Sequence, residues 1–120
     1  MIMKYIYHNN QSMTLDDYLT LIGTYPLTSP EDEKELARRI QAGDKNAEEV
    51  LYQGNLRFVP AVAKSYLNEG FPVEDLIMTG NDGLRLAISS FDPDSGFRFI
   101  AYAIWWVRKF MVDELDKSPL

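Results

Sequence analysis

The sequence predicts an all-α protein, and three observations support this fold class. Apolar residues recur at helical spacing in successive segments, whereas no segment shows the alternation that is typical of a half-buried strand. Several of these segments begin at residues that cap helices and end at glycines. The chain has 120 residues, of which 46% are hydrophobic, and this is enough for one helical core.

Two capped helices are expected near the start of the chain. Thr14 is followed three residues later by Asp17, a pattern similar to a capping box, and Gly23 ends this first helix. Ser29 has the position of a second N-cap, with Pro30 at the first helical position. Both helices therefore have start signals that are local in the sequence.

The remaining helices contain residues that disfavour a regular helix. Asp44 is the candidate cap of a third helix. Pro60 lies in a fourth helical segment and predicts a kink or a late start there, because proline has no amide hydrogen. Gly80 and Gly83 lie inside a helix expected over residues 72–90. A glycine inside a helix costs about 1 kcal/mol relative to alanine, so this pair predicts a close contact with another helix.

The expected organisation of the chain has four parts. The parts are an irregular N-terminus at residues 1–13, a helical segment at 14–43, the main helical domain at 44–116 and a tail at 117–120.

The composition of the chain excludes several classes of function. The chain has no cysteine and a single histidine, His8, so no metal, cofactor or enzyme activity is expected. With no membrane-spanning run and no signal-peptide pattern, a cytoplasmic protein without a membrane partner is expected. The formal net charge of -6 argues against tight non-specific binding to duplex DNA.

The stretch from Gly96 to Phe110 gathers six aromatic and three positively charged side chains in fifteen residues. At about 100° per residue, it has an inward face of Phe99, Ala103, Trp106 and Phe110 and a neighbouring face of Arg98, Tyr102, Trp105 and Lys109. Alternating rings and cations suit single-stranded nucleic acid, because rings stack on bases at about 1–3 kcal/mol each and cations follow the phosphates. The alternative is that the rings form the edge of the core and the cations extend over them. Spacing alone does not decide between the two.

Four stretches of the chain resemble, in the family's order, the bacterial sigma-70 family of transcription initiation factors. These stretches are "LTSPEDEKELARRIQAGD", "NLRFVPAVAKSY", "GFPVEDLIMTGNDGL" and "FDPDSGFRFIAYAIWWVRK". The resemblance covers about residues 14–111 and implies the family's helical domain two with the short helical segment before it. No stretch resembles the later domains that read the minus-thirty-five element.

The resemblance implies a role in promoter opening. Domain two of the family opens the promoter at the minus-ten element and captures two flipped bases of the non-template strand. The residues at the implied DNA-binding positions are Asn55, Leu56, Arg57, Phe97, Arg98, Phe99, Tyr102, Trp105, Trp106 and Lys109. Tyr102 matches the tyrosine that stacks on the flipped adenine, and Trp105 and Trp106 match the pair at the upstream edge of the bubble. Asn55 belongs to the motif that helps build the pocket for the downstream flipped base, with a helix cap as the alternative interpretation.

A second set of residues is implied to contact the RNA polymerase core. Asp75 and Asn81 match positions on the helix that docks on the clamp coiled coil, although Asp75 has the alternative interpretation of an acid in the first helical turn. Met78 and Thr79 stand where the family usually has glutamine and glutamate, so weaker docking is expected. The implied partners are RNA polymerase core and single-stranded promoter DNA, with an anti-sigma factor as a further candidate.

Other departures from the family pattern leave alternatives open. Ile100, Ala101 and Ile104 replace small hydroxyl residues that contact DNA in the family. Lys109 replaces a glutamine that reads duplex bases, and an acidic run begins at Asp113. One alternative to a sigma-type initiation factor, or its domain-two portion, is a sigma-like decoy or regulator that binds polymerase without opening promoters. Another is a helical protein-interaction module.

Overall fold

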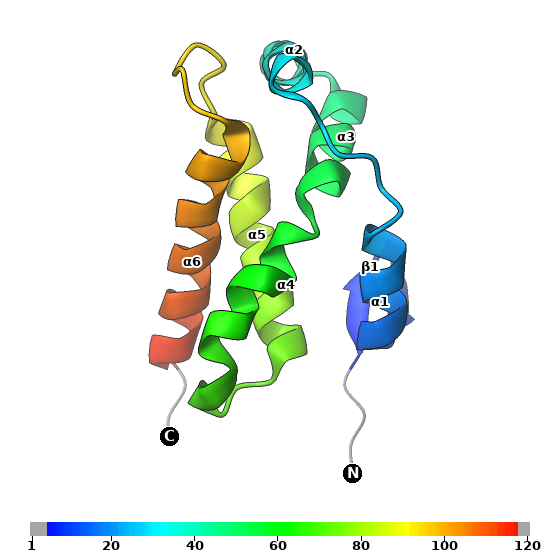
Figure 1. Ribbon diagram of the computed structural model, residues 1–120, viewed down its shortest axis with the longest axis vertical. Coiled ribbons are helices and arrows are strands. Elements are labelled where there is room, and N and C mark those ends of the chain that lie inside the picture. Colours follow the sequence, from blue (N-terminus) through cyan, green and yellow to red (C-terminus); the bar gives the residue numbers. More distant parts are fainter. Residues whose placement is uncertain (1–4, 118–120) are drawn as a thin grey trace.

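The computed structural model describes residues 5–117, apart from the side chains of Asn68 and Glu69. In chain order, the elements are β1 (Ile6–His8), β2 (Gln11–Met13), α1 (Leu15–Ile22), α2 (Pro30–Gln41), α3 (Lys45–Asn55), α4 (Phe58–Ala63), the 3-10 helix η1 (Lys64–Glu69), α5 (Val73–Ser90) and α6 (Phe99–Lys117). The two longest helices, α5 and α6, lie side by side along the long axis (Figure 1). The loop that joins them lies at the same end of the molecule as α2. The prediction of a helical fold is confirmed.

The N-terminus contains a small β-hairpin that the sequence did not predict. β1 and β2 pair antiparallel, with Ile6 opposite Met13. Asn9 and Asn10 form the turn with φ angles of 51° and 63°, as a two-residue turn of the hairpin-favouring kind requires. The expectation of an irregular N-terminus is therefore wrong for residues 5–13, and residues 1–4 lie outside the described residues. Strands of three residues are too short to show an alternating pattern, and Ile6 is completely buried by packing that the local sequence does not reveal.

The predicted helix caps are confirmed. The Thr14 hydroxyl accepts a hydrogen bond from the amide of Asp17 at 3.2 Å. Ser29 forms a capping box, in which its hydroxyl accepts from the Asp32 amide and the Asp32 carboxylate accepts from the Ser29 amide. The carboxylate of Asp44 caps α3 in the same way. These caps fix the starts of α1, α2 and α3 through contacts within one turn.

Pro60 delays the start of α4, as predicted. α3 ends at Asn55, and α4 begins only at Phe58. Pro60 is thus the third residue of α4, where a missing amide hydrogen removes no hydrogen bond within the helix. α3 and α4 are therefore separate helices, with Leu56 and Arg57 between them.

The close contact predicted from the glycines of α5 is with α6. A Cβ atom on Gly83 would lie 2.7 Å from the backbone oxygen of Trp106, and one on Gly80 would lie 2.5 Å from the Met111 side chain. At Gly83 the two backbones are almost in contact, which no other residue type permits without a shift. The inner side of α6 is therefore held directly against α5.

The inward face of α6 differs in part from the prediction. Its fully buried residues are Phe99, Ala103, Val107 and Met111. Trp106 and Phe110, which were expected to face inward, are only half-buried at the edge of the core. A buried residue at every fourth position drifts around a helix by about 40° per step, as expected where two helices cross. The contact with α5 therefore moves toward Val107 and Met111 and leaves Trp106 at the side.

Candidate nucleic-acid interface

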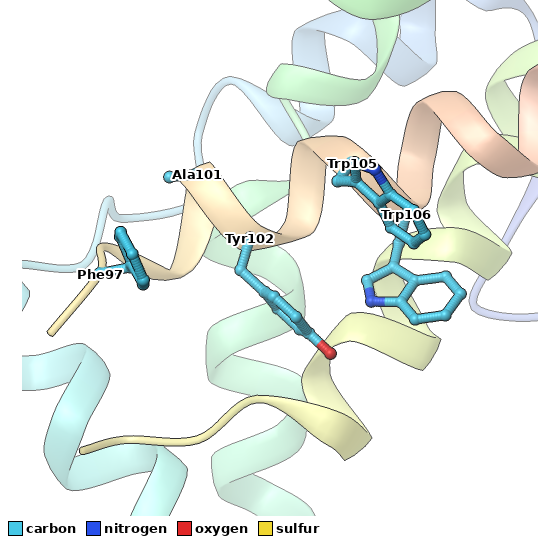
Figure 2. A pocket seen from close by; sticks show the side chains of 5 residues that line it. All are labelled: Phe97, Ala101, Tyr102, Trp105 and Trp106. Atoms are coloured by element: carbon cyan, nitrogen blue, oxygen red, sulfur yellow. The ribbon is translucent and has the colours of Figure 1, made fainter. Parts of the chain in front are cut away.

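An aromatic pocket opens on the outer side of α6, at its N-terminal half. Its volume is about 390 Å³, and its lining residues are Phe97, Ala101, Tyr102, Trp105 and Trp106. Phe97 comes from the loop before α6, and the other residues come from the first two turns of the helix (Figure 2). Four of the predicted DNA-binding residues are therefore brought together, and Ala101 is an addition.

The hollow exists because a small residue stands among large ones. Ala101 and Trp105 are four positions apart, as are Tyr102 and Trp106, so each pair lies on adjacent turns of one face. The two indole rings meet edge to face, with 4.8 Å between their centroids. Ala101 leaves open the space that a larger side chain would fill. The spacing of a small residue four positions before Trp105 was a signal for this pocket that the sequence interpretation did not use.

Two aromatic rings of the pocket are unusually exposed. Phe97 is 71% exposed and Trp105 is 59% exposed. The prediction that Trp105 stays outside the core is confirmed. Single exposed apolar residues are common but clusters of them are not, so this group of rings is a candidate binding site.

Tyr102 is held in place at the floor of the pocket. Its hydroxyl lies 2.7 Å from the hydroxyl of Ser90 on α5, and its ring lies 5.7 Å from the ring of Phe91. The Ser90 hydroxyl also lies 2.9 Å from the backbone oxygen of Leu86. Either hydroxyl can be the donor in the hydrogen bond between Tyr102 and Ser90, and this bond holds the ring in place.

Arg98 lies beside the pocket and is tied to α2. Its Nε donates to both carboxylate oxygens of Glu33, at 2.9 and 3.2 Å. The same carboxylate accepts a hydrogen bond from the backbone amide of Phe99, the first residue of α6. The hydrogen bond with Glu33 raises the pKa of Arg98 above its usual value. The side chain of Glu33 is buried, and nothing in the local sequence indicates this burial.

Lys109 lies on the same helix, further along, and has an acidic neighbour. Its Nζ is 3.4 Å from the Asp113 carboxylate, one helical turn away. A second hollow of about 300 Å³ adjoins this pair and is lined by Trp105, Arg108, Lys109, Val112 and Asp113. Trp105 thus lies between the aromatic pocket and a hollow with charged groups of both signs.

Three of the predicted DNA-binding residues have buried side chains. Asn55, Leu56 and Phe99 are at most 4% exposed, so the structure gives no support to direct contact of these side chains with DNA. Asn55 donates to the backbone oxygen of Leu51 within α3. Phe99 packs edge to face against Phe91 in the core. The family motif matches these residues by their order in the chain, and this order gives no information about the burial of their side chains.

Arg57 serves the fold at the junction between α3 and α4. Its guanidinium donates to the backbone oxygen of Tyr25 at 2.6 Å, and to that of Gly23 at 3.5 Å. Arg57 is half-buried and is not among the residues that line the aromatic pocket. Its prediction as a DNA-binding residue therefore has no support from the geometry of this pocket.

The four predicted polymerase-binding residues divide into two groups on α5. Asp75, Met78 and Thr79 lie within about 100° of one another around the helix, and all three are half-buried. Asn81 is buried, and its amide donates to the hydroxyl of Tyr18 on α1 at 3.0 Å. Asn81 is therefore an internal residue, and the prediction that it contacts polymerase directly does not agree with its burial.

Thr79 borders an acidic hollow between α5 and the C-terminal part of α6. The hollow measures about 280 Å³ and is lined by Thr79, Asp82, Phe110, Asp113, Glu114 and Lys117. Burial raises the pKa of Asp82 above its usual value. The lining of this hollow therefore carries three carboxylates, from Asp82, Asp113 and Glu114, and one cation, Lys117.

The described part of the chain shows neither a metal-binding cluster nor a membrane-spanning helix. Residues 5–117 contain no group of three or more histidine, aspartate or glutamate side chains that could hold a metal ion. No helix within the same residues has the length and apolarity needed to cross a membrane.

Comparisons with known proteins agree on one family. The family model described as sigma-70 region 2 matches residues 51–118, and the model described as sigma-70 factor, region 1.2, matches residues 14–46. The chain is 45% identical over 105 residues to the RNA polymerase sigma-C factor of Myxococcus xanthus, covering 88% of this chain and 36% of that protein. It is 45% identical over 92 residues to RNA polymerase sigma factor RpoS of Coxiella burnetii, covering 77% of this chain and 26% of that protein.

A third relative gives the same picture. RNA polymerase sigma factor SigA of Clostridium acetobutylicum is 45% identical over 103 residues, covering 82% of this chain and 27% of that protein. The chain thus spans about a third or less of the length of these curated relatives. Because the region 2 model alone matches more than half of the chain, the chain belongs to the sigma-70 family.

Proposed function

We propose that this chain binds RNA polymerase core and holds unpaired bases of the non-template strand at the minus-ten element during transcription initiation. The observation that carries the proposal is the pocket of Phe97, Tyr102, Trp105 and Trp106 around the small residue Ala101. Stacking surfaces of this kind bind single-stranded nucleic acid without needing a duplex groove. The family membership supports polymerase as the partner.

The charge distribution supports local binding rather than binding along a duplex. The formal net charge is -6, and Arg98, which follows Phe97 in the chain, already shares hydrogen bonds with Glu33. Lys109 has Asp113 as a neighbour at 3.4 Å. Rings therefore contribute more than charges, and the affinity for single strands should depend only modestly on salt.

The segment of residues 14–43 is proposed to support the DNA-binding domain of residues 44–116. Glu33, in this segment, accepts hydrogen bonds from Arg98 and from the amide of Phe99. Arg38 forms an ion pair with Asp94 in the loop before α6, at 3.2 Å. Both contacts hold the loop that carries Phe97.

A second candidate function is a sigma-like decoy that binds polymerase but does not open promoters. The observation that favours it is the acidic surface around Thr79, which includes Asp82, Asp113 and Glu114. Negative charge on this part of α6 repels duplex phosphates. A decoy keeps the polymerase contact and gains no affinity from single-stranded promoter DNA.

Fluorescence anisotropy with labelled oligonucleotides separates these functions. The chain, alone and with polymerase core, is titrated with a single-stranded minus-ten-like oligonucleotide and with its duplex. The proposal predicts tighter binding of the single strand and a salt slope of about -0.7 per phosphate contact. Equal affinity for the two forms in the presence of polymerase contradicts the proposal and favours the decoy.

A further inference from the structure

We propose that the hairpin of β1 and β2 is a proton-sensitive latch, which is closed while His8 is neutral and opens locally when His8 takes up a proton. The two family models match residues 14–46 and 51–118, so the hairpin lies outside both matched regions. It contributes no residue to the lining of the aromatic pocket. The latch is therefore independent of the proposed function.

The hairpin is too small to be stable without anchors on the helices. Each of its strands has three residues, and an isolated two-stranded hairpin is at best marginally stable in water. β1 packs against α1 and α5, and Figure 1 shows it beside α1. Its anchoring side chains are Ile6, which is completely buried, and His8, which is 7% exposed, whereas Tyr7 between them points outward. The closed position of the hairpin therefore depends on Ile6 and His8.

His8 joins the hairpin to two tyrosines of the helical part of the chain. Its Nε2 lies 2.8 Å from the hydroxyl of Tyr25, in the loop between α1 and α2. Its ring meets the ring of Tyr18 on α1 edge to face, with 5.8 Å between the centroids. The backbone oxygen of Tyr25 accepts a hydrogen bond from Arg57 at 2.6 Å. The partner of His8 is thus itself held in place from the junction between α3 and α4.

The surroundings of the closed latch disfavour a charge on His8. Burial has the largest influence and lowers the pKa of His8 below its usual 6.5, while Glu49 on α3 acts to raise it and Arg85 on α5 acts to lower it. Glu49 and Arg85 form an ion pair at 2.8 Å, so their effects on a proton at His8 largely offset each other. The other titratable groups that face His8 among the described residues are the hydroxyls of Tyr18 and Tyr25. Burial therefore dominates, and the closed latch holds His8 neutral.

Opening returns the His8 ring to water, where its pKa has the ordinary value. The open form therefore binds a proton more readily than the closed form. Opening should not depend on pH well above about pH 6.5, and it should become more frequent below that value, by at most about tenfold per pH unit, until the pKa of the closed form is reached.

The helices are able to stay in place while the hairpin opens. The amide of Asn81 on α5 donates to the hydroxyl of Tyr18 at 3.0 Å, and the Glu33 carboxylate on α2 accepts from the amide of Phe99. Neither contact includes a residue of the hairpin. Opening is therefore a local event, distinct from unfolding of the whole chain.

Amide hydrogen exchange of the full chain, followed residue by residue by NMR, tests the latch. Protection factors, corrected for the intrinsic exchange rate, are compared at about pH 7.5 and about pH 5.5. The amides of β1 and β2 report opening of the hairpin, and the amide of Leu84, in the buried part of α5, reports global unfolding. We expect hairpin protection to be at least about tenfold lower than that of Leu84 at both pH values. We also expect it to fall by up to about tenfold at the lower pH.

Three results of this experiment overturn the proposal. Hairpin amides that are as protected as Leu84 show that the hairpin opens only when the whole chain unfolds. Hairpin amides without protection at about pH 7.5 show that there is no closed latch. A fall of less than about twofold between the two pH values shows that opening does not depend on a proton.

His8→Gln is the matched variant, because glutamine does not titrate and still offers a hydrogen-bonding group to the Tyr25 hydroxyl. Its hairpin protection should be the same at both pH values. A fall equal to that of the parent chain assigns the effect to other groups and overturns the proposal.

A second measurement needs no variant. His8 is the single histidine of the chain, so its ring signals are identified directly in an NMR titration. We expect a midpoint below about pH 6.5. A midpoint at or above that value overturns the proposal, because the closed latch then does not exclude the proton.

Discussion

The buried carboxylate of Glu33 on α2 accepts a hydrogen bond from the Nε of Arg98 at 2.9 Å, and the two residues are 65 positions apart in the chain. The other carboxylate oxygen accepts from the amide of Phe99 at 3.2 Å. The first amides of a helix have no partner within the helix, so Glu33 caps α6 from a distant helix. It thereby determines where the pocket-bearing helix begins.

Removing the Glu33 carboxylate should destabilise the protein. In Glu33→Ala the buried amide of Phe99 loses its acceptor, which costs about 1–3 kcal/mol. Glu33→Gln retains a neutral acceptor and should cost less. Urea unfolding followed by tryptophan fluorescence measures both, with Glu35→Ala on the exposed side of α2 as a control that should change stability by less than about 0.5 kcal/mol. Equal stabilities for Glu33→Ala and the control would show that this cap contributes nothing.

The contact between α5 and α6 should not tolerate a methyl group at Gly83. In Gly83→Ala the new Cβ lies 2.7 Å from the Trp106 backbone oxygen, so the helices must separate. Overpacking of this kind costs about 1–3 kcal/mol. Gly23→Ala is the matched control, because its nearest contact is an ordinary 3.4 Å. Thermal unfolding of both variants measures the difference, and a Gly83→Ala protein as stable as the control contradicts the close contact.

The hairpin should make stability dependent on pH through His8. Burial lowers the pKa of His8 below its usual 6.5, and its Nε2 lies 2.8 Å from the Tyr25 hydroxyl. The unfolded chain therefore binds the proton more readily than the folded protein. The free energy of unfolding should be fully maintained above about pH 6.5 and fall as the pH decreases toward the folded-state pKa, by at most about 1.4 kcal/mol per pH unit.

His8→Gln is the variant that isolates this effect, because glutamine does not titrate. Urea unfolding between about pH 5.5 and 8 should give a smaller slope against pH for the variant than for the parent. Parallel slopes would assign the pH dependence to other groups. The comparison depends on the slopes and is unaffected by any constant loss of stability in the variant.

Polymerase binding should improve when the family's usual pair is restored at positions 78 and 79. The double change Met78→Gln with Thr79→Glu adds contacts worth at most about 1.5–3 kcal/mol if a charged partner meets them. Thr79 borders Asp82, Asp113 and Glu114, so the added carboxylate should also lower the stability of the free protein. The control variant is Met78→Gln with Thr79→Gln. Glutamine has about the size of glutamate but no charge, so this variant separates the effect of side-chain shape at position 79 from that of its charge. Calorimetry with the isolated clamp coiled coil measures the gain, and no gain in either double variant means that this face of α5 does not meet polymerase.

Features encoded by neighbouring residues were predictable from the sequence. Thr14, Ser29 and Asp44 cap their helices through contacts within one turn, so the sequence pattern contains all that is needed. Pro60 and Gly83 were informative because each is costly inside a helix unless the structure has a reason for it. Helical spacing also placed Trp105 outside the inward face of its helix, but it did not decide how far the ring is exposed.

Features that depend on distant contacts were not predictable in this way. Asn55 and Asn81 are polar residues of recognisable motifs, and only packing against other helices shows that they are buried. The burial of Glu33 requires α2 to lie beside the start of α6, which no local pattern specifies. The pocket itself was only partly foreseen, because the space above Ala101 appears once the surrounding rings have fixed positions.

The most direct test of the account is a double-mutant cycle between Tyr102→Ala and an abasic site at the captured base. Dissociation constants are measured by anisotropy in the presence of polymerase core, with Tyr7→Ala as a control because Tyr7 is an exposed tyrosine of the hairpin, outside the pocket. If Tyr102 stacks on that base, each change alone should cost about 1–3 kcal/mol, and the two together should cost little more than one. Fully additive losses, or a Tyr102→Ala variant that binds as well as the Tyr7→Ala control, would contradict the claim that this pocket holds an unpaired base.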